Sequence, residues 1–104
     1  MVLTTVPTLD VATVLAERLL AARLIACANI VPGVRSLYRW NNEIQRDDEV
    51  LLLMKSTVST YARLEASLAE AHPYDVPEIV SVPVSAGFAP YLDWVDGEVG
   101  GGHE

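Results

Sequence analysis

The chain has 104 residues, of which 51% are hydrophobic, and 7 basic against 14 acidic residues give it a formal net charge of −7. This length accommodates one domain, and the negative charge disfavours nucleic acid and anionic membrane surfaces as partners. No run approaches the roughly 20 apolar residues needed to span a bilayer, and no basic region typical of a signal peptide is present, so we expect a cytoplasmic protein. The high apolar fraction favours a subunit interface.

The first two elements are predicted to be a strand and a helix. Residues 2–6 are rich in strand formers and end at Pro7, after which Thr8 suits a helix N-cap and Asp10 suits the first turn. From residue 9 to residue 23, apolar side chains recur at steps of three and four, which is the period of an amphipathic helix.

A long hairpin is predicted next. Residues 24–31 and 34–40 read as strand, and Pro32-Gly33 between them indicates a bulge or bend, because proline cannot donate to a ladder and glycine tolerates positive φ. Asn41-Asn42 suits a two-residue hairpin turn. The return strand then takes residues 43–45 and 49–56. Such a hairpin extends beyond a small core and could pair with a neighbouring subunit.

The rest of the chain completes an α+β pattern. We expect a helix over residues 59–71 that ends before Pro73, a strand over 79–84, and a short helix over 89–95. This order predicts a ferredoxin-like fold, in which an antiparallel sheet with an extended central hairpin carries two helices on one face, followed by a short C-terminal helix. Residues 1–97 form the single predicted domain, and residues 98–104 are predicted to be a disordered tail.

Four segments resemble one known family: "ARLIACANIVPGVRSLYRW", "EVLLLMKST", "HPYDVPEIVSVPV" and "YLDWV", spread in order over the chain. Together they are similar to the CutA family of divalent-cation tolerance proteins. The resemblance implies a ferredoxin-like fold assembled as a tight homotrimer, in which strands of the long hairpin complete sheets between subunits. It also implies an architecture similar to that of the trimeric PII signalling proteins, no assigned reaction, and a role in tolerance to copper and other divalent ions.

His72 is the principal metal candidate, because imidazole suits copper(II) and related ions. In family members proposed to bind copper, a cysteine of the first strand and two adjacent histidines after the second helix are the ligands. This chain has Thr4 and Ala71 at two of those positions, so the resemblance implies a weak site at best. The alternative for His72 is a contact with the last carbonyls of its helix.

Cys27, the single cysteine, is a second and weaker metal candidate. Thiolate is a soft ligand, but neither a CxxC pattern nor a neighbouring histidine accompanies it. The alternative is that Cys27 packs as a small hydrophobic residue. The sequence therefore predicts that no cofactor is required, and it leaves copper(II) or another divalent cation as a candidate ligand.

A set of aromatic and charged residues is expected at a subunit boundary. In the fold that the resemblance implies, the hairpin approaches the segment that follows the second helix. These residue types are typical of a small-molecule cleft, and they are also typical of a subunit interface. Its members are Tyr38, Trp40, Lys55, Tyr74 and Glu78.

No catalytic constellation stands out. Ser56, Ser59 and Thr60 lie near Lys55, but capping and turn formation explain them, and the acidic stretch 47–49 lacks the spacing of a calcium loop and reads as a solvated hairpin face. The sequence therefore predicts a non-enzymatic homotrimer that contributes to divalent-metal (copper) tolerance with weak or indirect metal binding. The alternatives are a PII-like signalling module that binds a small ligand between subunits and a purely structural assembly platform.

Overall fold

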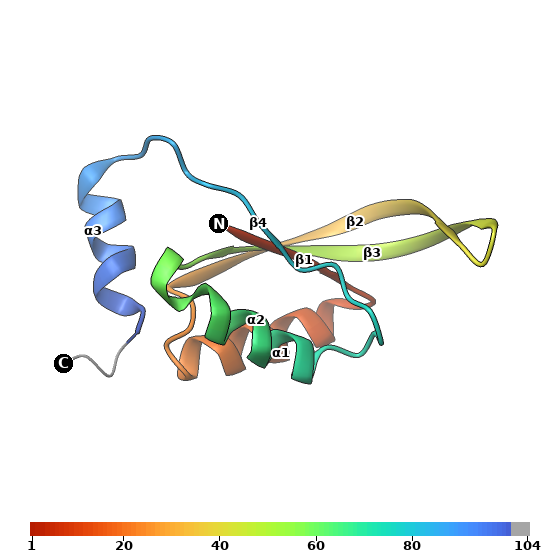
Figure 1. The fold of residues 1–104 in the computed structure, drawn as a ribbon, viewed down its shortest axis with the longest axis horizontal. Coiled ribbons are helices and arrows are strands. Elements are labelled where there is room, and N and C mark those ends of the chain that lie inside the picture. The colour runs from red at the N-terminus through yellow and green to blue at the C-terminus, as the bar shows by residue number, and fades with distance from the viewer. Residues whose placement is uncertain (101–104) are drawn as a thin grey trace.

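The computed structural model describes residues 1–100, which form a four-stranded antiparallel sheet with two helices against one of its faces (Figure 1). The strand order is β2-β3-β1-β4, as a ferredoxin-like α+β fold requires. None of the described helices is long and apolar enough to cross a membrane. In chain order the elements are β1 (Val2–Val6), α1 (Leu9–Ala21), β2 (Cys27–Trp40), β3 (Glu43–Lys55), the 3-10 turn η1 (Val58–Thr60), α2 (Tyr61–Ala71), β4 (Val80–Ser81) and α3 (Ala89–Glu98).

The core lies between the sheet and the two helices. Alternation along β1 and β3 turns one side of each strand toward the helix layer. The register sets Val2 opposite Met54 and Thr4 opposite Leu52, so these side chains share that face. Val2, Leu52 and Met54 pack with the apolar stripes of both helices to make one buried cluster, whose largest members are Leu15, Leu19, Leu24, Ile25, Leu52, Met54, Leu64 and Leu68.

The central hairpin confirms both turn predictions. The β2–β3 register shifts between Val31 and Val34, which places a bulge at Pro32-Gly33, and Gly33 has φ +79°. Asn41 and Asn42 have φ of 50° and 63°, as a type I′ turn requires. We call the part of the hairpin beyond the bulge, residues 34–49, the arm. It reaches well past the helix layer (Figure 1).

Helix α1 ends at Ala21, two residues earlier than predicted. Arg23 has φ 56°, so it lies in the left-handed region and cannot continue the helix. The N–H of Leu24 donates to the carbonyl of Leu19 (3.0 Å) and the N–H of Arg23 to that of Leu20 (3.0 Å), which together make a Schellman motif. This cap turns the chain so that Leu24–Ala26 enter the core before β2 begins at Cys27, not at Leu24 as predicted.

Strand β4 is shorter than the predicted strand over residues 79–84. Only Val80 and Ser81 pair with β1, opposite Leu3 and Val2. The N–H of Val82 then donates to the carbonyl of Met1 (2.8 Å), and beyond it Pro83 has no N–H with which to extend the ladder. The chain therefore leaves the sheet and runs exposed to α3 (Figure 1).

Helix α3 is longer than predicted and continues to Glu98. Val95 and Val99 form a small buried cluster with Ala26, and Val99 is only 3% exposed. The N–H of Gly100 donates to the carbonyl of Arg23 (2.8 Å). The predicted domain boundary at residue 97 thus falls inside this helix, because side-chain packing against Ala26 outweighs the helix-breaking tendency of Gly97. The remaining part of the predicted tail, 101–104, lies outside the described residues.

Candidate functional site

His72 follows α2 and its imidazole is buried, at 7% exposure of the residue. Nε2 lies 2.9 Å from the carbonyl oxygen of Thr5 and 3.1 Å from Oγ1 of Thr4, and Nδ1 accepts a hydrogen bond from the N–H of Tyr74 (3.2 Å). The ring therefore ties β1 to the segment after α2. The alternative contact with the helix carbonyls is not made by the ring, since only the backbone N–H of His72 bonds to Leu68 (2.9 Å).

These partners define the protonation state of the imidazole. The Tyr74 N–H can only donate, so Nδ1 carries no proton, and the Thr5 carbonyl can only accept, so Nε2 carries it. Burial lowers the pKa of His72 and outweighs the opposing influence of the Thr5 carbonyl and of Glu49. At neutral pH the ring is thus the uncharged Nε2–H tautomer, with a partner on each nitrogen.

This arrangement does not fit a copper site. A metal needs a free nitrogen lone pair, and the one unprotonated nitrogen of His72 is held by Tyr74. Thr4 supplies only a neutral hydroxyl and Ala71 supplies no donor. Within residues 1–100, no three histidine, cysteine, aspartate or glutamate side chains come together where they could hold an ion.

Cys27 lies away from His72, at the start of β2. Its Sγ is 3.3 Å from the hydroxyl of Tyr91 on α3, and it is half-buried there. The side chain thus contributes to the contact between β2 and α3 and shares no site with the histidine. Cys27 is a free cysteine and forms no disulfide bond.

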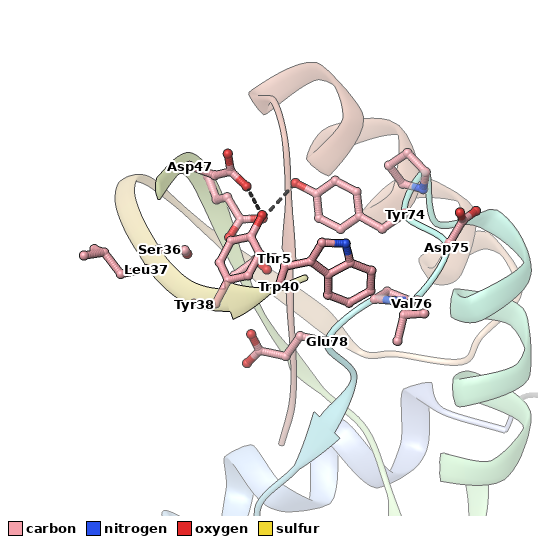
Figure 2. Close-up of a pocket in the computed structure, with 13 residues that line it drawn as sticks. Thr5, Ser36, Leu37, Tyr38, Trp40, Asp47, Tyr74, Asp75, Val76 and Glu78 are labelled. Carbon is pink, nitrogen blue, oxygen red and sulfur yellow. Dashed lines mark hydrogen bonds between the residues drawn. The ribbon is translucent and has the colours of Figure 1, made fainter. Parts of the chain in front are cut away.

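A cleft of about 770 Å³ lies between the arm and the segment 73–78, which we call the loop (Figure 2). Thr5 at the end of β1 forms its floor between these two walls. The arm contributes Ser36, Leu37, Tyr38, Trp40, Asp47 and Glu49, and every residue of the loop, Pro73, Tyr74, Asp75, Val76, Pro77 and Glu78, lines it as well.

Four of the five residues predicted for a cleft or an interface line it. Tyr38 and Trp40 come from the arm, and Tyr74 and Glu78 from the loop (Figure 2). Lys55 does not, because it lies at the base of the hairpin opposite Cys27, where its Nζ donates to Oδ1 of Asn29.

Strand alternation explains which arm residues enter the cleft, except Leu37, which lines it from the opposite face of the arm. Ser36 is opposite Asp47 and Val34 is opposite Glu49, so Ser36, Asp47 and Glu49 lie on the same face as Tyr38 and Trp40. The sequence pattern predicts that residues 47–49 form one solvated face. Glu49 is in fact 8% exposed, and the alternation of β3 is the signal that separates its side from that of Asp48.

Two tyrosine hydroxyls hold the arm carboxylates. The Tyr74 hydroxyl donates to Oε2 of Glu49 (2.7 Å) and the Tyr38 hydroxyl donates to Oδ2 of Asp47 (Figure 2). Burial and the bond to Glu49 raise the pKa of Tyr74, and the bond to Asp47 raises that of Tyr38. Both phenols therefore stay protonated, as donors, throughout the physiological pH range.

The fold and the cleft define a small ferredoxin-like α+β protein whose concave surface is formed by a hairpin arm and a loop. The sequence pattern of the CutA1 divalent ion tolerance proteins matches residues 1–98. The divalent-cation tolerance protein CutA of Thermus thermophilus is 48% identical over 94 residues, which cover 90% of this chain and 91% of that protein. The chain belongs to the CutA family.

Solved structures agree with this assignment. The divalent cation tolerance protein Cut A1 of T. thermophilus has a TM-score of 0.93 at 46% identity, over 95% of this chain and 96% of that one. The periplasmic divalent cation tolerance protein CutA of Archaeoglobus fulgidus has a TM-score of 0.90 at 31% identity, over 93% and 94% of the two chains.

Proposed function

We propose that this protein is a non-enzymatic homotrimer that contributes to divalent-metal (copper) tolerance indirectly, without a dedicated copper site at His72. The observation that carries the proposal is the imidazole of His72, which has an internal partner on each of its nitrogens. Binding a metal there would break the hydrogen bond from Tyr74 and leave a partly buried N–H without an acceptor, at a cost of about 1–3 kcal/mol.

A calorimetric titration with copper(II) tests this proposal. The full-length His103→Ala variant removes the second histidine of the sequence, and His103→Ala/His72→Phe removes both. We expect the two proteins to give the same copper isotherm. Micromolar binding at a defined ratio in the first protein, absent from the second, would contradict the indirect role.

The homotrimer is supported by apolar surface that the single chain leaves uncovered. The face of the sheet opposite the helices carries the exposed Val31 and the half-buried Leu3, Leu51 and Leu53, which the register places side by side. Every residue of the segment 81–90 is exposed as well, including three large apolar side chains, Val82, Val84 and Phe88. Such a surface is typical of obligate interfaces.

Mass measurement in solution tests the assembly. Sedimentation equilibrium at micromolar concentration should give a mass of about three chains of 11.3 kDa. A monomer under those conditions would contradict the trimer. If unfolding and dissociation are coupled, the midpoint temperature should also rise with protein concentration.

A second candidate function is that of a PII-like signalling module that binds a small ligand in the cleft. The observation that favours it is the size and lining of the cleft, about 770 Å³ with aromatic and polar side chains, and this volume lies within the usual range for small-molecule sites. A ligand that binds only the native state raises its stability, so a thermal-shift screen of metals, nucleotides and amines tests this function. If no metal, nucleotide or amine raised the midpoint temperature, this function would be contradicted.

We also propose a cytoplasmic location, as expected from the sequence, although the A. fulgidus relative is described as periplasmic. The free thiol of Cys27 is compatible with a reducing compartment. Fractionation of cells that express the protein checks the location, and recovery with a periplasmic marker would contradict it.

A further inference from the structure

We infer that the cleft binds a linear organic cation with an amino group at each end, a diamine or polyamine. This inference rests on the ligand-binding function proposed above and names the class of the ligand. It starts from the charges of the lining. Four carboxylates line the cleft, while none of its lining residues, all within the described chain, is a lysine, arginine or histidine: the four are Asp47, Glu49, Asp75 and Glu78.

Glu49 is the strongest single indication of a cation. The residue is 8% exposed and lines the cleft, and its carboxylate accepts one hydrogen bond, from the Tyr74 hydroxyl (2.7 Å). The ion pairs of the described residues join Arg18, Arg23 and Arg35 to other acids, and none includes Glu49. A buried carboxylate is normally paired, because removing an unpaired charge from water is costly. A cation in the cleft would supply that partner.

The aromatic walls suit an organic cation. Tyr38, Trp40 and Tyr74 line the cleft, and in the single chain Trp40 and Tyr38 are 53% and 42% exposed (Figure 2). An ammonium group over a tryptophan or tyrosine face is attracted by the ring quadrupole. The methylene groups of an alkyl amine can in turn cover apolar ring surface that is now in water.

The carboxylates stand on two walls, which favours a ligand charged at both ends. Asp47 and Glu49 lie on the arm, and Asp75 and Glu78 lie on the loop. The Trp40 ring lies between Asp47 and Asp75 (Figure 2). An inorganic divalent ion would need several oxygens converging on one point. No such convergence of three acidic side chains occurs in the part of the chain that the structure describes.

The basic residues of the arm do not neutralise this face. Arg35 is opposite Asp48, Arg46 opposite Leu37, and Arg39 opposite Ile44. Since residues opposite one another share a face, all three arginines project from the other side of the arm than Tyr38, Asp47 and Glu49. A phosphate-bearing ligand such as a nucleotide would therefore meet only negative charge in the cleft.

Calorimetric titration of the full-length protein with 1,4-diaminobutane tests the inference. Its neutral isostere 1,4-butanediol and magnesium chloride serve as ligand controls. We expect the diamine to bind and the diol not to bind. Magnesium chloride should weaken diamine binding only as much as another salt of equal ionic strength does. Equal binding of diol and diamine, or displacement of the diamine by an equimolar amount of magnesium, would overturn the inference.

Two charge-matched variants locate the binding. Asp75→Asn/Glu78→Gln removes two charges from the loop without breaking any hydrogen bond of the structure, and Asp93→Asn/Asp96→Asn removes two from α3, away from the cleft. We expect the diamine affinity to fall by about tenfold or more in the first and to be unchanged by the second. Equal affinities in the two variants would overturn the cleft as the site.

Glu49→Gln gives an independent readout, since its amide oxygen can still accept from the Tyr74 hydroxyl while the charge is lost. It should also weaken the diamine by about tenfold. A parallel titration with ATP distinguishes the proposal that the cleft binds a ligand from the inference that this ligand is a cation. Binding of ATP without diamine binding would overturn the cationic class and leave a ligand-binding module standing, whereas binding of neither would overturn both.

Discussion

Replacement of His72 by phenylalanine should destabilise the protein in a pH-dependent way. The ring size is similar, but the donor to the Thr5 carbonyl (2.9 Å) and the acceptor for the Tyr74 N–H (3.2 Å) are lost. Each hydrogen bond is worth about 1 kcal/mol net, and a buried group left without a partner costs about 1–3 kcal/mol. We therefore expect the free energy of unfolding to fall by about 2–3 kcal/mol at pH 7.5.

The pH dependence follows from the lowered pKa of His72 in the folded state. Its unfolded value is near 6.5, so below that pH the unfolded chain takes up a proton that the folded ring refuses. The stabilising contribution is fully present above about pH 6.5 and is lost as the pH falls toward the folded pKa, by at most about 1.4 kcal/mol per pH unit. The phenylalanine variant has no such titration, so the difference between the two proteins should shrink on acidification.

Denaturant unfolding of His103→Ala and His103→Ala/His72→Phe at one protein concentration, between pH 5 and 8, measures this difference. The carboxylates titrate in both proteins and largely cancel. His72→Gln is a matched control, which keeps an amide donor but cannot titrate, and should therefore lose the slope and less of the stability. A stability difference that is constant from pH 8 to pH 5.5 would refute the reasoning. So would an NMR titration of the ring with a midpoint at or above pH 6.5.

Three further substitutions have predictable outcomes. Tyr74→Phe removes the donor to Glu49 and should lower the unfolding free energy by about 1–2 kcal/mol in denaturant melts, whereas no change would show that water replaces the bond. Gly33→Ala should cost about 1 kcal/mol in the same melts, because φ is +79° although the Cβ would meet open space, and a neutral result would contradict strain as the cause. Trp40→Ala should weaken the trimer by about 2 kcal/mol or more in sedimentation equilibrium, and an unchanged assembly would exclude Trp40 as an interface anchor.

The hairpin could be predicted from sequence because its signals are local. Pro32-Gly33 and Asn41-Asn42 restrict the backbone by themselves, and neighbouring residues suffice to read them. The ends of α1 and α3 could not be read in this way. Arg23 adopts a left-handed conformation that glycine normally takes, and Val99 is buried only because Ala26, far away in sequence, packs on it. Tertiary contacts decide both.

The cleft was predictable in its aromatic residues and in Glu78, and not in its other three carboxylates. Tyr38, Trp40, Tyr74 and Glu78 were expected near one another, and the structure lines one cavity with them. Lys55 was placed with them although the register puts it at the base of the hairpin. The buried charge of Glu49 depends on the loop folding back so that Tyr74 reaches it, which the sequence of β3 alone does not indicate.

His72 links the stability of the fold to the shape of the cleft. Its ring holds β1 through Thr5 and holds the loop through the Tyr74 N–H, and the Tyr74 hydroxyl in turn reaches Glu49 on the arm. Protonation of the imidazole at Nδ1 would remove the acceptor for the Tyr74 N–H. The proton that destabilises the fold would therefore also loosen Tyr74, whose hydroxyl donates to the buried Glu49 carboxylate. The hydrogen bonds of His72 therefore fit a neutral support that positions the loop and Tyr74 at the cleft better than they fit a copper ligand.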